Sequence, residues 1–206
     1  LALPFFARLR RDDPVHWHAD SHRGPFWSVT RFEDIKFVDQ HPELFSSEGS
    51  ITLEDVRDDL PVRQFIAMDA PEHDLQRKTV APVVGPRNLA AMERLIRERV
   101  VTILDSLPVG EPFDWVDRVS IELTTQMLAT LFDFPFEDRR KLTFWSDVAT
   151  GGPHSGIVKD RAEQLRVLHD CLDTMTALRD ARRDQPEQGT DLLSMLGHGE
   201  DTRGMD

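Results

Sequence analysis

A histidine and an arginine stand four residues apart, at His73 and Arg77, in the stretch "MDAPEHDLQRK". In a helix this spacing places both side chains on one side, about one turn from each other. Arginine supplies a planar fork of N–H donors and histidine supplies a ring N–H, so the pair could bind a carboxylate or a phosphate. The same spacing also fits a solvated polar face. The pair is therefore a candidate anion-binding site that needs further support.

Three residues before the pair predict where its helix begins. Asp69 can accept hydrogen bonds from the free amides of a first turn, and Glu72 follows it at the spacing of a capping box. Pro71 suits a first turn because it lacks an amide proton. We therefore expect the helix to begin at Asp69.

The composition is that of an ordinary globular protein. The 206 residues are 39% hydrophobic and 30% charged, and 25 basic against 37 acidic residues give a net charge of −12. This charge argues against nucleic acid as a partner, and no apolar run approaches the ~20 residues of a membrane span. The single Cys171 excludes an internal disulfide and fits a cytoplasmic protein.

Hydrophobic patterning predicts a mainly α fold with a small N-terminal β-sheet. Residues 46–64 contain Gly49 and Pro61 and read as a mobile loop with one helical turn. Before this loop we expect a helix, two short strands and a helix, at residues 4–13, 14–19, 24–30 and 31–42.

From Asp69 onward nearly every segment has a helical pattern. Residues 88–107 carry one apolar stripe, consisting of Leu89, Met92, Ile96, Val100, Ile103 and Leu107. Residues 114–134, which include Trp115, are apolar around most of the cylinder and predict a central, largely buried helix. Two helices follow at 136–150 and 159–184, the second with a stripe of Leu165, Leu168, Leu172 and Met175, and a last helix is expected to start at a Thr190 cap.

Other candidate sites have simpler explanations. His16 and His18 could share one side of a strand, but no third metal ligand accompanies them. The glycine-rich "GGPHSG" lacks the lysine and spacing of a phosphate loop and reads as a helix stop. Cys171 lies beside an apolar helical stripe, so we expect a structural cysteine, and we predict no metal site.

The opening stretch resembles a specific family. "MDAPEHDLQR" is similar to the helix that follows the substrate-facing loop in bacterial cytochrome P450 monooxygenases, where the usual pattern is Met-Asp-Pro-Pro-Glu-His with arginine four residues after histidine. The resemblance implies that His73 and Arg77 hold a propionate of haem b. Ala70 departs from the pattern, which usually has a second proline, and leaves both donors in place. "PVHWHADSHRGPFWSVTRFEDIKFVDQHPELFSS" is similar to the family's first strand pair and next helix.

Long stretches such as "WVDRVSIELTTQMLATLFDFPFEDRRKLTFWSDVAT" look most like the bacterial alkane and fatty-acid omega-hydroxylases. This implies terminal hydroxylation of an apolar small molecule with O2, and electrons from a ferredoxin and its NADH-dependent, FAD-containing reductase. By position, Phe65 and Ile66 would contact substrate, and residues 148–158 would form the roof that opens over it. Four basic residues could face the iron–sulfur ferredoxin: Lys78, Arg87, Arg94 and Arg97.

The resemblance also implies that residues 1–206 are the N-terminal part of one monooxygenase domain, with a helix and small sheet at 1–45, a substrate loop at 46–68 and a helical part at 69–206. The motif with the axial cysteine would follow residue 206, so we expect no catalytic residue in this chain and no activity from it alone. Two alternatives stay open. A member of the same superfamily could act on a terpenoid or macrolide, or a non-catalytic helical module could bind an anion.

Overall fold

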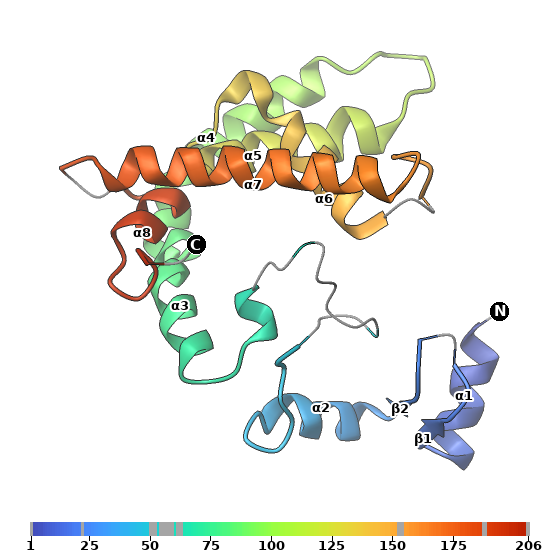
Figure 1. The fold of residues 1–206 in the computed structure, drawn as a ribbon. Helices are drawn as coiled ribbons and strands as arrows, with labels where there is room; N and C mark the ends of the chain where they lie inside the picture. Colours follow the sequence, from blue (N-terminus) through green and yellow to red (C-terminus); the bar gives the residue numbers. More distant parts are fainter. Residues whose placement is uncertain are drawn as a thin grey trace. The chain divides into compact units, whose positions relative to one another are not determined.

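The computed structural model describes residues 2–21, 23–49, 53, 60, 64–151, 155–186 and 189–204. They form a mainly helical chain with one two-stranded sheet, which confirms the predicted fold class (Figure 1). The chain divides into two compact units, residues 1–75 and 76–206. We describe each unit by itself.

The first unit contains the only sheet in the described part of the chain. Helix α1 (Ala2–Asp12) is followed by strands β1 (Val15–His18) and β2 (Phe26–Val29), which pair antiparallel with Trp17 opposite Trp27. Helix α2 (Phe32–Gln40) follows, and the 3₁₀ turn η1 (Phe65–Ala67) precedes α3. These elements match the prediction, while the predicted mobile loop falls largely outside the described residues.

The second unit is an assembly of helices. Helix α3 (Glu72–Val80) is continuous across the boundary between residues 75 and 76. After it and the turn η2 (Ala81–Val84) come α4 (Pro86–Asp105), the π-helical turn η3 (Val116–Ile121), α5 (Glu122–Phe132) and η4 (Phe136–Asp138). Helices α6 (Arg140–Gly151), α7 (Arg161–Arg183) and α8 (Leu192–His198) complete the unit. In Figure 1, α7 runs alongside α5 and α6, and α8 returns to the end of α7.

The main hydrophobic core joins α5, α6 and α7. Its buried members are Ala129, Phe134, Leu142, Trp145, Val148, Val158 and Val167. The Trp145 ring meets the Phe134 ring edge to face, with centroids 5.9 Å apart, which is a favourable aromatic geometry. Buried Gln164 of α7 donates a hydrogen bond to the Val148 carbonyl of α6 at 2.9 Å. The core therefore fixes α6 against α7.

Several predictions of helix faces and helix starts are wrong in detail. Of the stripe predicted on α7, Leu168 and Met175 pack against the core, as predicted, but Leu165 and Leu172 are not among its members. The other core residues of this helix are Val167, Cys171 and Leu178. Trp115 is 55% exposed because it precedes η3 and lies outside the buried part of α5. Asp191, not Thr190, caps α8, accepting a hydrogen bond from the Ser194 amide at 2.9 Å.

The stripe of α4 is also less buried than predicted. Ile103 is its only buried member, and Leu89 is 45% exposed. The described residues that pack against α4 come from α5, η2 and η3, which leave most of the stripe uncovered.

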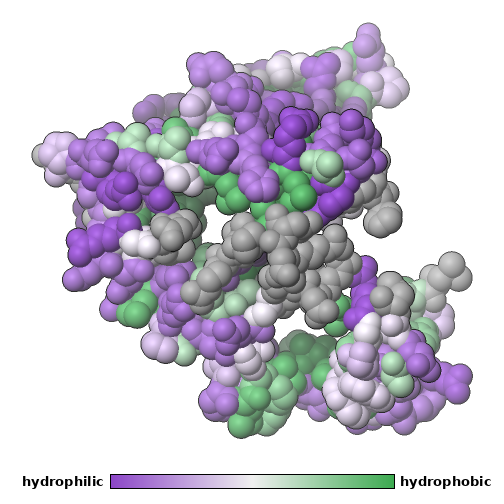
Figure 2. Space-filling view, in the orientation of Figure 1, coloured by the Kyte–Doolittle hydropathy of each residue, from purple (hydrophilic) through white to green (hydrophobic). Residues whose placement is uncertain are grey.

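Exposed apolar groups are also found in the first unit. On the face drawn in Figure 2, purple hydrophilic residues predominate and green hydrophobic ones gather over α2, where Phe32, Ile35 and Phe37 are exposed. In the described part of the chain, no helix has the length and apolar character needed to span a membrane.

Candidate functional site

His73 and Arg77 both lie on α3, so the helix itself brings them to one side, one turn apart. The backbone amide of His73 donates to the Asp69 carbonyl at 3.0 Å, and the Leu75 amide donates to the Pro71 carbonyl at 3.1 Å. These bonds begin the first turn at the predicted place, although the α-helix proper begins at Glu72. His73 and Arg77 therefore share one side of α3, as predicted, because the helix is continuous between them.

The His73 ring is held from two directions. Its Nδ1 lies 3.0 Å from Oδ1 of Asp74, and its face stacks on the Phe65 ring with centroids 6.0 Å apart and planes 24° from parallel. The side chain is 28% exposed. With Nδ1 and one ring face occupied, the Nε2 edge is the part of the ring available to a ligand.

Arg77 is exposed, and no hydrogen bond or ion pair joins its guanidinium to any other residue in the described part of the chain. Other arginines of the second unit have carboxylate partners, such as Arg94 with Glu98 at 2.6 Å and Arg139 with Glu122 at 2.7 Å. An arginine that makes no ion pair keeps its five N–H donors for an external anion.

Gln76 lies one turn from His73 on α3, on a buried side of the helix, and was not identified from the sequence. It lies three residues after His73 and one before Arg77, its side chain is 6% exposed, and its Oε1 has no hydrogen-bond partner among the described residues. A buried acceptor without a partner costs free energy, so such groups are usually paired in a complete structure. In the sequence, the only sign that Gln76 lies near His73 is their spacing of three residues, which is about one helical turn.

The Asp69 carboxylate does something other than cap the helix. Its Oδ2 accepts a hydrogen bond from the Ser46 hydroxyl at 2.5 Å and its Oδ1 accepts one from the Ser47 amide at 2.8 Å. The prediction of a side-chain cap is therefore wrong, because both oxygens bind the segment that follows α2. The hydrogen bond from Ser46, and then that from Ser47, lower the pKa of Asp69.

We expect the two hydrogen bonds from Ser46 and Ser47 to Asp69, here called the clasp, to be sensitive to acid. Because the folded-state pKa of Asp69 is lowered, the clasp is complete above the ordinary aspartate range and is lost as the pH falls through the lowered value. We expect the NMR chemical shift of the Ser47 amide to titrate with Asp69. The Asp69→Asn variant should abolish that titration, and a pH-dependent Ser47 shift that survives this substitution would contradict the assignment.

The two residues predicted to contact substrate lie on η1, directly before this clasp. Ile66 is 51% exposed, whereas Phe65 is half-buried against His73. Their contact with a substrate stays a prediction. Of the segment predicted as a roof, Val148 and Val158 belong to the hydrophobic core and residues 152–154 lie outside the described part of the chain.

The remaining candidate sites do not form ligand sites. His16 and His18 do lie together on β1, with ring centroids 4.6 Å apart, but Asp13 and Ser28 occupy one nitrogen of each. Within the described ranges, no three histidine, cysteine, aspartate or glutamate side chains are placed to hold a metal ion.

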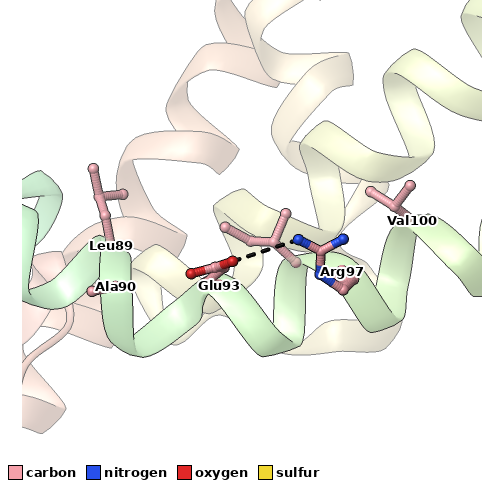
Figure 3. Close-up of a pocket in the computed structure, with 6 residues that line it drawn as sticks. Leu89, Ala90, Glu93, Arg97 and Val100 are labelled. Atoms are coloured by element: carbon pink, nitrogen blue, oxygen red, sulfur yellow. Dashed lines mark hydrogen bonds and ion pairs between the residues drawn. The ribbon is translucent and has the colours of Figure 1, made fainter.

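A groove of about 450 Å³ follows α4, and its lining residues all come from that helix (Figure 3). The ion pair between Glu93 and Arg97, 3.5 Å long, crosses the groove between Leu89 and Val100. Arg94 pairs with Glu98 in the same way. Because each arginine faces a glutamate one turn away, this part of the predicted basic patch is locally neutral.

Known proteins resemble this chain along its whole length. The chain is 42% identical to cytochrome P450-153 from Novosphingobium aromaticivorans, with a TM-score of 0.85 over 100% of this chain and 52% of that structure. The chain belongs to the cytochrome P450 superfamily. It corresponds to the N-terminal half of the P450 fold. No family model matches the sequence.

Two curated relatives have names that describe their chemistry. Linalool 8-monooxygenase of Pseudomonas putida is 30% identical over 95% of this chain and 50% of its own length. A methyl-branched lipid omega-hydroxylase of Mycobacterium tuberculosis is 27% identical over 95% of this chain and 48% of its own length. The chain thus spans about half the length of the curated relatives it matches.

Membership in the P450 superfamily implies haem, and α3 offers a donor set that fits a haem propionate. A propionate is a carboxylate, which takes charge-assisted hydrogen bonds from a guanidinium fork and an imidazole N–H. In the described part of the chain Arg77 makes no ion pair, and the hydrogen bond of the His73 ring uses Nδ1 and leaves Nε2 without a hydrogen-bond partner. The residues present are therefore suited to hold one acid group of the cofactor.

Cys171 does not fit the role of a P450 thiolate. It lies within α7, half-buried and packed against the hydrophobic core. Burial, and to a lesser extent the charge of Asp170, raise the pKa of its thiol, so the protonated form is favoured. The expectation of a structural cysteine agrees with this environment.

Proposed function

We propose that the protein is a haem-thiolate monooxygenase that hydroxylates the terminal methyl group of medium-chain alkanes or fatty acids. The observation that carries this proposal is the placement of exposed Arg77 and the Nε2 edge of His73 one turn apart on α3, which suits a haem propionate. When bound, a thiolate-ligated haem activates O2 for insertion of one oxygen atom into a C–H bond.

The residues of this chain would bind and orient rather than react. Arg77 and His73 would neutralise the propionate, while Ile66, 51% exposed on η1, would offer apolar contact to a hydrocarbon chain. The thiolate ligand would come from a part of the protein outside these 206 residues. Electrons would come from NADH through an FAD-containing reductase and a ferredoxin.

The preference for a terminal carbon rests on the similarity to a protein named as a lipid omega-hydroxylase. A second candidate is oxidation of a terpenoid, which the similarity to a linalool 8-monooxygenase favours. Both candidates require the same cofactor and differ in the substrate alone.

Two measurements on the full-length protein test the proposal. The carbon-monoxide difference spectrum should show the Soret band of a thiolate-ligated haem, and its absence would reject the enzyme. With ferredoxin, reductase and NADH, gas chromatography and mass spectrometry should identify 1-octanol as the main product from n-octane. Mainly internal octanols would contradict the terminal specificity, and turnover of linalool without turnover of octane or octanoic acid would contradict the proposed substrate class.

A further inference from the structure

We propose that Phe65 is a positioning residue that acts through His73, holding the imidazole at the angle from which its Nε2 edge meets the haem propionate. The inference rests on the proposed function, because it adds a supporting residue to the same cofactor contact. It assigns Phe65 a role distinct from the substrate contact predicted by its position in the sequence.

The geometry of the stack carries the first step. The two rings lie 6.0 Å apart at 24°, within the range in which offset aromatic pairs attract each other. The His73 side chain is 28% exposed, so the histidine is not enclosed on all sides by packing. The Phe65 face is therefore a principal restraint on rotation of the imidazole.

The second step comes from Asp74. Its carboxylate lies 3.0 Å from Nδ1 of His73, but the Asp74 side chain is 71% exposed and adjacent in sequence. An exposed polar contact of this kind restrains a side chain weakly. Asp74 can thus select which ring nitrogen faces the ligand, whereas the orientation of the ring plane depends on Phe65.

The third step is the attachment of Phe65 itself. Its element η1 is closed by the hydrogen bond from the Ala67 amide to the Gln64 carbonyl at 2.8 Å. Three residues later, Asp69 is tied to Ser46 and Ser47. The turn that carries Phe65 is therefore closed by its own hydrogen bond and followed by an anchored residue, which lets the Phe65 ring act as a fixed surface for His73.

The test is a double-mutant cycle on haem retention in the full-length, haem-loaded protein. Haem loss is measured as the rate of transfer to excess apomyoglobin. Phe65→Leu keeps apolar bulk but removes the ring, and we expect haem loss about 2- to 10-fold faster than wild type. Phe65→Tyr keeps the ring and should retain the wild-type rate.

The cycle separates positioning from general stabilisation. In the His73→Ala background, Phe65→Leu should have no further effect, because the group through which Phe65 acts is gone. Equal effects of Phe65→Leu in both backgrounds, or an unchanged rate in Phe65→Leu itself, would overturn the inference. If haem loss responds to Arg77→Ala and not to Phe65→Leu, this inference alone fails. If the wild-type protein binds no haem, the proposed function fails.

Discussion

Replacing Arg77 with alanine in the full-length protein is expected to weaken haem retention by about 10- to 100-fold, measured as the rate of haem transfer to apomyoglobin. The reason is the loss of one charge-assisted partner of a buried carboxylate, a contribution of about 1.5 to 3 kcal/mol. No hydrogen bond or ion pair joins the Arg77 side chain to another residue in the described part of the chain, so its removal breaks no such interaction there. The fold should therefore be preserved.

The matched control is Arg94→Ala. Arg94 is also an exposed helical arginine, and its side chain pairs with Glu98 one turn away on α4. This substitution should leave the rate of haem loss unchanged, since the pair is solvated and weak. Similar rates in the two variants would mean that Arg77 is an ordinary surface residue.

Replacing Trp145 with alanine is expected to lower the free energy of unfolding by about 3 to 5 kcal/mol. Trp145 is 4% exposed, belongs to the core between α5, α6 and α7, and packs edge to face on Phe134. Its removal leaves a large cavity between α5, α6 and α7, which pack against one another in this core. Urea unfolding followed by circular dichroism measures the loss.

The matched control is Trp115→Ala, which makes the same substitution at an exposed position. Trp115 is 55% exposed, so its removal should change the free energy of unfolding by less than about 1 kcal/mol. Should Trp145→Ala fail to fold, Trp145→Phe should still be measurable and fall between the two. Equal losses at positions 145 and 115 would contradict the assignment of the core.

Regular helices and strands could be predicted because their patterns are local. The alternation in "VHWH" and "FWSV" predicted the strand pair, and helical spacing predicted α4 through α7. The choice between two neighbouring faces was harder. On α7 the helical spacing groups Leu165, Leu168, Leu172 and Met175 into one stripe, whereas the packed helices select Leu168 and Met175 from it.

The details that sequence reasoning missed depend on contacts between distant residues. Asp69 has the residue type and place of a helix cap, yet Ser46 and Ser47 reach its carboxylate from 23 and 22 residues away. The π-helical turn η3 changes the helical register before α5, which leaves Trp115 outside the buried face that a constant period predicts. The stack of Phe65 on His73 likewise needs the fold of η1 and the turn before α3.

The placement of His73 and Arg77 on one side of a helix could be predicted from the sequence, because it depends on a single helix. His73 and Arg77 need no tertiary contact to share one side of α3. What they bind could not be read from spacing, and it became interpretable through similarity to cytochrome P450 proteins.

A crystal structure of the full-length, haem-loaded protein tests the central claim most directly. We expect the Arg77 guanidinium and the Nε2 atom of His73 to lie within hydrogen-bonding distance of the same haem propionate. A haem whose propionates are held by other residues, with the His73 and Arg77 side of α3 facing solvent, would contradict it.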